Sequence, residues 1–363
     1  MASSSSPRPV HGGSLTWAAA VADCSPDSLL DFSASINPLG PPPSVRLALT
    51  EAIAHLGHYP DPQYQQLRTA LAAHHGLTSD WVLPGNGAAE LITWAARDLS
   101  GIADGSVYLP TPAFGDYRRA LAGFGCTPRP WPLLSQGGVD LASQALLSPA
   151  TAAAGILINN PHNPTGHLFP QSELRPLLDH ASLVVVDEAF MDFLPPHQQQ
   201  SLVPWLGQYP NLVVLRSLTK FYSLPGLRLG YALGHPDRLG RWQGWRDPWP
   251  VNSLAVAAGM AAIADQAFQR RTWQWLPPTR QALWQGLGAL PGYRPWPGSA
   301  NYLLVETDQS VPALQEELLR QHRILIRDCL SFPELGDRYL RVAVRSEAEN
   351  HRLLAALQSL QPL

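Results

Sequence analysis

Short apolar runs alternate with helical patterns through the middle of this chain, and this alternation constrains the fold most strongly. Helical patterns cover Ser44–Leu56, Gln63–His74 and Gly87–Leu99. Five apolar runs bounded by turn residues then follow, as expected for strands buried on both faces: Ser106–Leu109, Gly155–Asn159, Leu183–Val186, Leu212–Leu215 and Leu229–Leu233. Helices between such strands imply crossover connections, so the sequence predicts an α/β domain with a mainly parallel sheet.

The pattern changes after Pro277-Pro278, which follow an expected Ala-rich helix over Val251–Gln274. The elements expected beyond the prolines are a helix Thr279–Leu287, a strand Tyr302–Glu306, a helix Ala313–Gln321, strands Ile324–Arg327 and Tyr339–Val344, and a helix Glu347–Leu357. This mixture is typical of a small α+β domain. We therefore predict an N-terminal arm that forms part of the small domain over 1–44, a large domain over 45–270 and a small C-terminal domain over 271–363.

Composition argues against several classes of function. The net charge of -3 suggests neither a nucleic-acid partner nor an anionic membrane. The three cysteines, Cys24, Cys126 and Cys329, lie far apart, which argues against a disulfide framework or a zinc site, and we expect no metal. The first ten residues have no apolar signal segment, and the small-apolar run Leu254–Ala264 is too short to span a bilayer. We expect a soluble, cytoplasmic protein.

Lys220 is the only lysine among 25 lysine and arginine residues. An arginine guanidinium stays protonated, whereas a desolvated lysine amine can lose its proton and act as a nucleophile. A single lysine can also arise by chance, so its neighbours must decide whether it has a function.

Two loops after expected strands have the composition of ligand-binding loops. Gly85–Glu90 follows a short strand at Trp81–Leu83 and opens a helix, with Asn86 as a possible N-cap. Free backbone N–H groups at such a helix start can bind a phosphate, although an ordinary glycine turn would look the same. The second loop is Asn160-Pro161-His162-Asn163-Pro164-Thr165-Gly166, whose prolines and glycine make it rigid, so that an asparagine could hydrogen-bond a cofactor oxygen.

Charged residues follow the next strands. Asp187 ends an apolar strand, where a carboxylate is costly unless it is paired, for example with a protonated pyridine nitrogen or in a structural ion pair. Ser217 precedes Lys220 by three residues and Arg228 follows it by eight, so both could reach one phosphate. Ser217 and Lys220 also fit the SxxK pattern of acyl-enzyme hydrolases, but those enzymes need a second lysine, which this chain lacks.

Together, Asn163–Gly166, Asp187, Ser217–Lys220 and Arg228 resemble the fold-type I, class I/II aminotransferase family in order and approximate spacing. The resemblance covers essentially the whole chain. It implies the aspartate aminotransferase-like fold of pyridoxal-phosphate-dependent transferases, an α/β architecture with a large domain and a small α+β domain.

The resemblance also implies roles for individual residues. The cofactor would be pyridoxal 5'-phosphate, held as a Schiff base on Lys220, with Asp187 on the pyridine nitrogen and Asn163 on the 3-oxygen. Phe114 would stack on the ring, and Tyr59 would reach the cofactor phosphate of a second subunit, which implies a homodimer with a shared active site. The remaining phosphate ligands would be Gly87, Ala88, Ser217 and Arg228.

Two branches of the family bind phosphorylated amines: the histidinol-phosphate aminotransferases and the L-threonine-O-3-phosphate decarboxylases. The finer resemblance is to the decarboxylases and rests on His11–Gly13, Asp31–Pro41, Asp187–Phe190, Ile324–Cys329 and Tyr339–Arg345. The aminotransferases usually carry a tyrosine at the position of Phe190.

The decarboxylase branch implies a small phosphorylated amino acid as substrate. Arg341 would clamp its carboxylate through a planar fork and Arg327 would bind its phosphate, with further contacts from His11, Asn37 and Asn163. The expected reaction is decarboxylation of L-threonine O-3-phosphate to (R)-1-aminopropan-2-yl phosphate and CO2, in cobalamin synthesis. Transamination of histidinol phosphate, another aminotransferase reaction and a β-lyase reaction remain alternatives.

Overall fold

The computed structural model describes residues 7–102, 106–135, 138–139, 141 and 154–361. These residues fall into two compact units. The larger unit comprises the described parts of Ile36–Asn163 and His167–Trp273, and the smaller one those of Met1–Ser35, Pro164–Gly166 and Gln274–Leu363. Residues 36–44, which the sequence assigned to the arm, belong to the larger unit.

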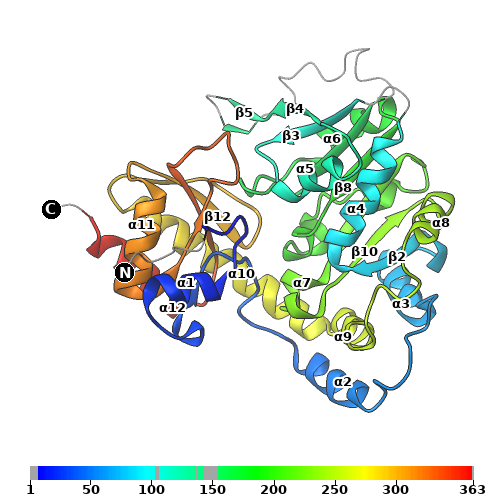
Figure 1. Cartoon of the computed structure of the whole chain (residues 1–363), viewed down its shortest axis with the longest axis horizontal. Coiled ribbons are helices and arrows are strands. Elements are labelled where there is room, and N and C mark those ends of the chain that lie inside the picture. Colours follow the sequence, from blue (N-terminus) through cyan, green and yellow to red (C-terminus); the bar gives the residue numbers. More distant parts are fainter. Residues whose placement is uncertain (1–6, 103–105, 136–137, 140, 142–153, 362–363) are drawn as a thin grey trace. The chain divides into compact units, whose positions relative to one another are not determined.

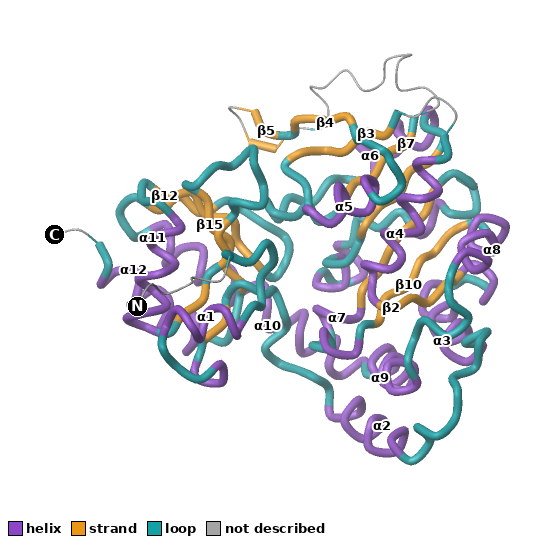
Figure 2. The backbone as a smooth tube through the Cα atoms, in the orientation of Figure 1, coloured by secondary structure: helices purple, strands orange, loops and turns teal. Residues whose placement is uncertain are grey.

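A seven-stranded sheet, ordered β2-β10-β9-β8-β7-β3-β4, forms the centre of the larger unit (Figure 2). Its pairs are parallel from β4 to β9, whereas β10 is antiparallel to both β9 and β2. The mainly parallel sheet predicted from the apolar runs is therefore confirmed. The strands are β2 (Val82–Asn86), β3 (Val107–Thr111), β4 (Arg129–Pro132), β7 (Gly155–Asn159), β8 (Leu183–Asp187), β9 (Leu212–Ser217) and β10 (Leu229–Gly234).

Alternate strand residues point to opposite faces of the sheet, and the residues of β7, β8 and β9 are all buried, so both faces must be covered. One face, with Leu157, Val185 and Leu215, packs in a single apolar cluster with α4, α5 and α8. The helices of the larger unit are α2 (Pro43–Ile53), α3 (Gln65–His75), α4 (Gly87–Ser100), α5 (Gly115–Ala122), α6 (Gln171–His180), α7 (Leu218–Phe221), α8 (Pro236–Trp245) and α9 (Ser253–Ala264), and a two-stranded β5–β6 ribbon (Leu134–Ser135 and Gly138–Val139) completes its elements (Figure 1).

The smaller unit is built on an antiparallel four-stranded sheet, β11-β12-β15-β14. A separate parallel pair joins β1 (Leu30–Asp31) to β13 (Ile324–Leu325). This arrangement agrees with the predicted α+β pattern. The other elements are α1 (Leu15–Ala22), β11 (Tyr293–Pro295), β12 (Tyr302–Thr307), α11 (Val311–Glu317) with the π-helical turn Leu318–His322, β14 (Arg327–Asp328), β15 (Tyr339–Ala343) and α12 (Glu347–Ser359).

The helices expected on either side of the prolines differ from those observed. The expected helix over Val251–Gln274 is broken at Asp265, whose side chain accepts the Phe268 N–H at 2.9 Å and starts a new helix, α10 (Gln266–Gly288). The prolines Pro277-Pro278 lie inside α10 rather than ending the pattern. A buried face with Leu276, Leu283 and Leu287 runs along the helix past the prolines, so packing outweighs the lost hydrogen bonds.

The expected strand Ile324–Arg327 is also divided. Ile324 and Leu325 pair with β1, whereas Arg327 and Asp328 pair with β15 in the other sheet. Within the described residues, no helix combines the length and the apolar character needed to cross a membrane.

Candidate active site

Three adjacent strands of the larger unit bring the Lys220 segment and the glycine loop to one edge of the sheet, the edge at which strands β2 and β9 end. Gly230 of β10 pairs with Gly85 of β2 on one side and with Ser217 of β9 on the other. Because β10 is antiparallel to both, its first residues lie where β2 and β9 end. Arg228 therefore reaches the same edge as Ser217 although it precedes its strand, a feature that a purely parallel sheet would not produce.

The start of α4 is closely packed against Arg228. Gly87 has φ +74°, and a Cβ atom built on it would lie 2.5 Å from Arg228 Nη2. A Cβ on Gly230 would lie 2.6 Å from the backbone nitrogen of Ala88. Only glycines at these two positions allow a guanidinium and the first amides of α4 to converge, and this convergence is suited to a phosphate.

The Arg228 side chain is available for an anion. It is exposed, its only hydrogen bond within the described chain goes to the Pro225 carbonyl at 3.2 Å, and no described carboxylate pairs with it. Its backbone is in the left-handed region, with φ +59°, which is unfavourable for a residue with a side chain.

Asn86 does not act as the predicted side-chain cap of α4. Its side chain makes no capping hydrogen bond, and its backbone N–H donates to Glu90 Oε2 at 2.6 Å. The amides of the helix start are therefore not covered by an asparagine side chain, as a cap would have required.

Ser217, Thr219 and Lys220 form a chain of polar groups at the start of α7. The hydroxyls of Ser217 and Thr219 are 2.7 Å apart, and Lys220 Nζ lies 3.5 Å from Thr219 Oγ1. The centroid of the Phe190 ring lies 5.2 Å from Lys220 Nζ. Thr219, for which no role was predicted, thus connects the Ser217 hydroxyl to the Lys220 amine.

Asp187 is buried and interacts with a tyrosine that the sequence did not single out. Tyr117 of α5 donates its hydroxyl proton to Asp187 Oδ2 at 2.7 Å, and the Ala189 N–H donates to Oδ1 at 3.0 Å. Burial raises the pKa of the Asp187 carboxyl, while the Tyr117 hydrogen bond and the Lys220 charge lower it. A buried carboxylate in this setting is suited to a cationic partner.

The asparagine loop starts beside Asp187. Asn159 and Asp187 are paired across β7 and β8, and the Asn160 N–H donates to the Asp187 carbonyl at 2.9 Å. His162, which is fully buried, donates a ring proton from Nε2 to the Pro112 carbonyl at 3.0 Å, and burial lowers its pKa to about 3. His162 is thus neutral and connects the loop of Asn163 to the loop of Phe114.

Phe114 lies at the start of α5, three residues before Tyr117. The two rings are in edge contact, with centroids 5.5 Å apart. Because positions i and i+3 share a helix face, the stacking candidate could have pointed to Tyr117. The spacing of Phe114 and Tyr117 is visible in the sequence, but the hydrogen bond from Tyr117 to Asp187 could be found only in the folded chain.

On the opposite face of the sheet, the residues next to Asp187 and Ser217 form a buried ion cluster. Arg216 Nη2 lies 2.9 Å from Glu188 Oε2, and Arg216 Nη1 lies 2.5 Å from Asp192 Oδ1. Arg216 and Glu188 are almost completely shielded from solvent. This cluster links the ends of β8 and β9, from which Asp187 and Ser217 project.

The smaller unit carries the two arginines predicted to bind substrate. Arg327 and Arg341 are directly paired across β14 and β15, and both are buried. Burial, and then the neighbouring Arg341 guanidinium, lower the pKa of Arg327, and burial lowers that of Arg341. Two adjacent buried cations are unfavourable together and would be stabilised by an anionic ligand.

The N-terminal segment is attached to the same part of the smaller unit. Arg327 donates hydrogen bonds to the Val10 carbonyl and to Ser331 Oγ. Arg8 pairs with Glu316 at 3.0 Å and with Asp328 at 3.4 Å. His11, the next residue after Val10, is exposed.

Asn37 and Tyr59 are the two remaining predicted site residues. The Asn37 side chain is buried and hydrogen-bonded within the larger unit. Tyr59 is 80% exposed and its ring contacts Trp249, with centroids 4.7 Å apart. No group of three or more His, Cys, Asp or Glu side chains suited to a metal ion occurs among the described residues.

Comparison with known proteins assigns the chain to a family. The sequence model described as aminotransferase class I and II matches residues 27–357. A threonine-phosphate decarboxylase of Salmonella typhimurium is 43% identical over 355 residues, covering 96% of each chain. A histidinol-phosphate aminotransferase of Ralstonia nicotianae is 34% identical over 339 residues, covering 91% of this chain and 88% of the relative.

Solved structures agree with this assignment. The histidinol-phosphate aminotransferase of Clostridium acetobutylicum superposes with a TM-score of 0.84 at 27% identity, covering 92% of this chain and 99% of that one. The chain therefore belongs to the class I and II aminotransferase family, and the predicted family and fold class are both confirmed.

Proposed function

We propose that the larger unit binds pyridoxal 5'-phosphate through Lys220. The phosphate would lie at the edge formed by Gly87, Ala88, Ser217 and Arg228, and the missing Cβ of Gly87 leaves room for it beside Arg228. Asp187 would hold the pyridine nitrogen and Asn163 the 3-oxygen, while Phe114 would stack on the ring. The fit is supported by the exposed Arg228 and by the buried Asp187.

When bound, the cofactor supplies an electron sink for the electron pair released as a bond to the substrate Cα breaks. The residues of the chain direct this chemistry. Asp187, which accepts the Tyr117 hydroxyl proton, would supply a negative charge for the ring nitrogen. Lys220 is the chain's only side-chain primary amine, and we propose that its Nζ returns a proton to the substrate Cα after the carboxylate has left.

We propose that the reaction is decarboxylation of L-threonine O-3-phosphate to (R)-1-aminopropan-2-yl phosphate and CO2, in cobalamin synthesis. The observation that carries this proposal is the adjacent pair of buried arginines, Arg327 and Arg341. The substrate has a phosphate for Arg327 and a carboxylate for Arg341, with His11 near the phosphate and Asn163 as a further contact. The 43% identity to the Salmonella decarboxylase supports the same choice.

Histidinol-phosphate transamination is the alternative, supported by the similarity to enzymes with that name. Histidinol phosphate has a phosphate but no carboxylate, so it would use only one arginine of the pair. The second half-reaction would bring a keto acid, whose carboxylate could occupy the other. The two reactions differ in their products.

Two parallel incubations separate these reactions. The holoenzyme is supplied with O-phospho-L-threonine alone, and separately with histidinol phosphate and 2-oxoglutarate. We expect CO2 and the amine phosphate in the first incubation and no glutamate in the second. Glutamate in the second without CO2 in the first would replace the decarboxylase by the aminotransferase.

The role of Arg327 is tested in the same assay. Arg327→Ala should raise the KM for O-phospho-L-threonine by about 100-fold or more, as expected for loss of a charged hydrogen-bond partner, and should leave cofactor affinity nearly unchanged. An equal loss of substrate and cofactor binding would contradict the assignment of Arg327 to the substrate phosphate.

We also propose a homodimer that shares its active sites, in the cytoplasm. Large apolar side chains are exposed on α2 and in the segment after it: Leu47 62%, Ile53 57%, Leu56 56% and Tyr59 80%. Trp249, which is 42% exposed, contacts the Tyr59 ring. A group of this kind is unusual on a monomer and is suited to an interface. Tyr59 would reach the cofactor phosphate of the partner subunit.

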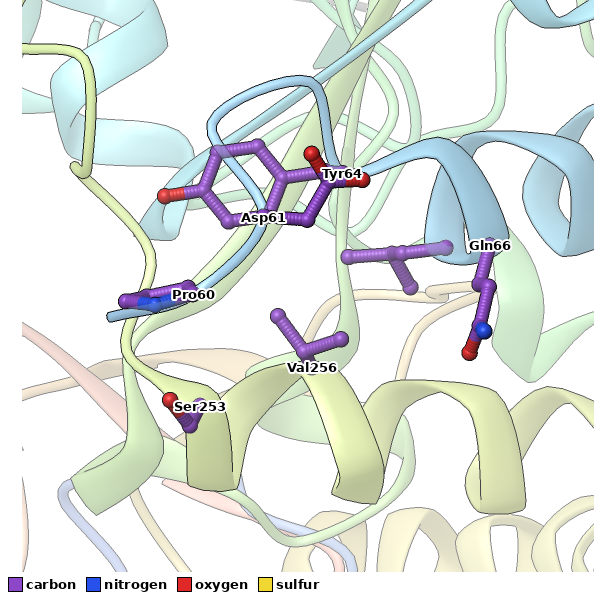
Figure 3. A pocket seen from close by; sticks show the side chains of 7 residues that line it. Pro60, Asp61, Tyr64, Gln66, Ser253 and Val256 are labelled. Carbon is purple, nitrogen blue, oxygen red and sulfur yellow. The ribbon is translucent and has the colours of Figure 1, made fainter. Parts of the chain in front are cut away.

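A hollow of about 250 Å³ lies next to Tyr59, and Figure 3 shows Tyr64 and Asp61 over it and Val256 of α9 below it. Its lining is completed by Pro60, Gln66, Leu67 and Ser253. A partner side chain could fill it. Sedimentation should show a dimer for the wild type and dissociation for the double variant Ile53→Glu, Leu56→Glu, whereas a monomeric wild type would refute the shared site.

A further inference from the structure

We propose that Asn37 is a positioning residue that fixes the turn carrying Lys220, rather than a ligand of the substrate. This inference rests on the proposed role of Lys220 in holding the cofactor. It replaces the expectation that the Asn37 side chain contacts the substrate.

The backbone of Asn37 is hydrogen-bonded to Lys220 and to Ser223, which follows α7. Its N–H donates to the Lys220 carbonyl at 3.0 Å, and its own carbonyl accepts the Ser223 hydroxyl at 2.5 Å. The connection spans more than 180 residues of sequence and lies entirely within the larger unit. It ties the segment before α2 to the turn after β9.

The side chain of Asn37 is used internally as well. Nδ2 donates one proton to the Phe221 carbonyl and one to Thr272 Oγ1, both at 2.9 Å. Oδ1 accepts the Leu39 N–H at 3.0 Å, and the residue is 1% exposed. Both amide protons are therefore used within the protein, and none is left to donate to a substrate oxygen.

The Lys220 turn needs such outside support. Helix α7 has four residues, Leu218–Phe221, which is too short to be stable through its own hydrogen bonds. Asn37 binds two consecutive carbonyls at its end, those of Lys220 and Phe221. Together with Ser217, whose side chain accepts the Thr219 N–H at the other end, it sets where the Lys220 side chain begins.

Placement of this amine matters because a reacting group displaced by about 1 Å can lose roughly 100-fold in rate. A positioning role therefore predicts slower chemistry at Lys220 with little change in substrate affinity. A ligand role predicts weaker substrate binding with unchanged chemistry at Lys220.

The test uses the holoenzyme with the variants Asn37→Ala, Thr272→Val and Thr272→Ser. Thr272→Val removes the hydroxyl that accepts the Asn37 amide and keeps the shape, while Thr272→Ser keeps an acceptor and serves as the matched control. Three quantities are measured: the pH midpoint of the bound-cofactor absorbance, the rate of borohydride trapping at Lys220, and kcat and KM for O-phospho-L-threonine.

We expect Asn37→Ala to shift the absorbance midpoint and to lower both the trapping rate and kcat by about 10-fold or more, with KM within about 3-fold. Thr272→Val should change these quantities in the same direction to a smaller extent, and Thr272→Ser should resemble the wild type. If Asn37→Ala does not fold, the Thr272 pair decides alone.

Two results would overturn the positioning role. One is a raised KM with unchanged midpoint, trapping rate and kcat in Asn37→Ala. The other is a Thr272→Val variant indistinguishable from Thr272→Ser in all three quantities. Wild-type protein in which borohydride traps no cofactor at Lys220 would instead refute the proposed function, and the positioning role with it.

Discussion

Tyr117 donates its hydroxyl proton to Asp187 at 2.7 Å, and both side chains are buried in the larger unit. Burial raises the pKa of Asp187, and the Tyr117 hydrogen bond opposes this change. The tyrosine thus helps to keep a carboxylate ionised at the end of an apolar strand, which is what a cationic ring nitrogen requires.

Removing the Tyr117 hydroxyl should therefore weaken cofactor binding. We expect Tyr117→Phe to lose about 10- to 100-fold in affinity for pyridoxal 5'-phosphate, as for a hydrogen bond to a charged group. The matched control is Tyr209→Phe, which removes a 2.8 Å hydrogen bond to Asp179 at the surface. Fluorescence titration of both cofactor-free variants measures the effect, and equal affinities would contradict it.

A side chain at position 87 should be unfavourable for two reasons that can be tested separately. An alanine at position 87 would adopt φ +74° and place its Cβ 2.5 Å from Arg228 Nη2. Gly76 has a similar φ of +67° with nothing within 4 Å of a Cβ, so Gly76→Ala carries the backbone strain alone.

Both alanine variants should lose about 1–2 kcal/mol of unfolding free energy from the left-handed backbone. Only Gly87→Ala should also lose cofactor affinity, because Arg228 must move, and we expect at least about 10-fold. Equilibrium binding and urea unfolding check this pair. Full cofactor affinity in Gly87→Ala would show that the phosphate does not lie beside Arg228.

The Glu188–Arg216–Asp192 cluster should matter for stability. Arg216→Met would leave two buried carboxylates without their cation, and we expect a loss of about 3–5 kcal/mol in the free energy of unfolding. Arg294 also pairs with two carboxylates, Glu306 and Asp308, but at the surface. Arg294→Met should leave the free energy of unfolding nearly unchanged. Equal losses in the two variants would show that burial does not make the Arg216 cluster more important for stability.

Asp187 should make the stability of the cofactor-free protein depend on pH. Because burial raises its pKa above 3.8, the folded protein holds this proton more tightly than the unfolded chain does. Its contribution to the free energy of unfolding therefore falls as the pH rises from about 3.8 through the raised pKa of Asp187.

Asp187→Asn removes this titration. The unfolding free energy of the cofactor-free variant, relative to that of the wild type, should therefore rise as the pH rises from about 3.8 through the raised pKa of Asp187, while cofactor binding is lost. Chemical denaturation at a series of pH values measures the difference. A difference independent of pH would mean that Asp187 does not titrate in this range.

Much of the larger unit was predictable from the sequence because its strands are buried on both faces and read as apolar runs. The observed β7, Gly155–Asn159, has the predicted bounds, and the loops with Asn163 and Asp187 follow their strands as expected. The antiparallel direction of β10 was not predictable, since an apolar run carries no information about its partner. That direction is what brings Arg228 to the edge at which Ser217 lies.

Most of the side-chain contacts at the site could not be predicted from the sequence. Tyr117 and His162 contact segments that are distant in sequence. Thr219 is adjacent to Lys220, but no sequence pattern marks its hydroxyl as part of the site. Asn37 shows the same limit in reverse, because the resemblance to the decarboxylases implied a substrate contact for its side chain. Its hydrogen bonds to α7 and α10 became visible only in the folded chain.

Reductive trapping tests most directly whether Lys220 holds the cofactor. Borohydride treatment of the protein with pyridoxal 5'-phosphate should fix the cofactor to one peptide, the one containing Lys220, because no other lysine exists in the chain. Peptide mass analysis should find the adduct there, and Lys220→Ala should show none at any side chain. Wild-type protein without an adduct at Lys220 would contradict the proposed chemistry.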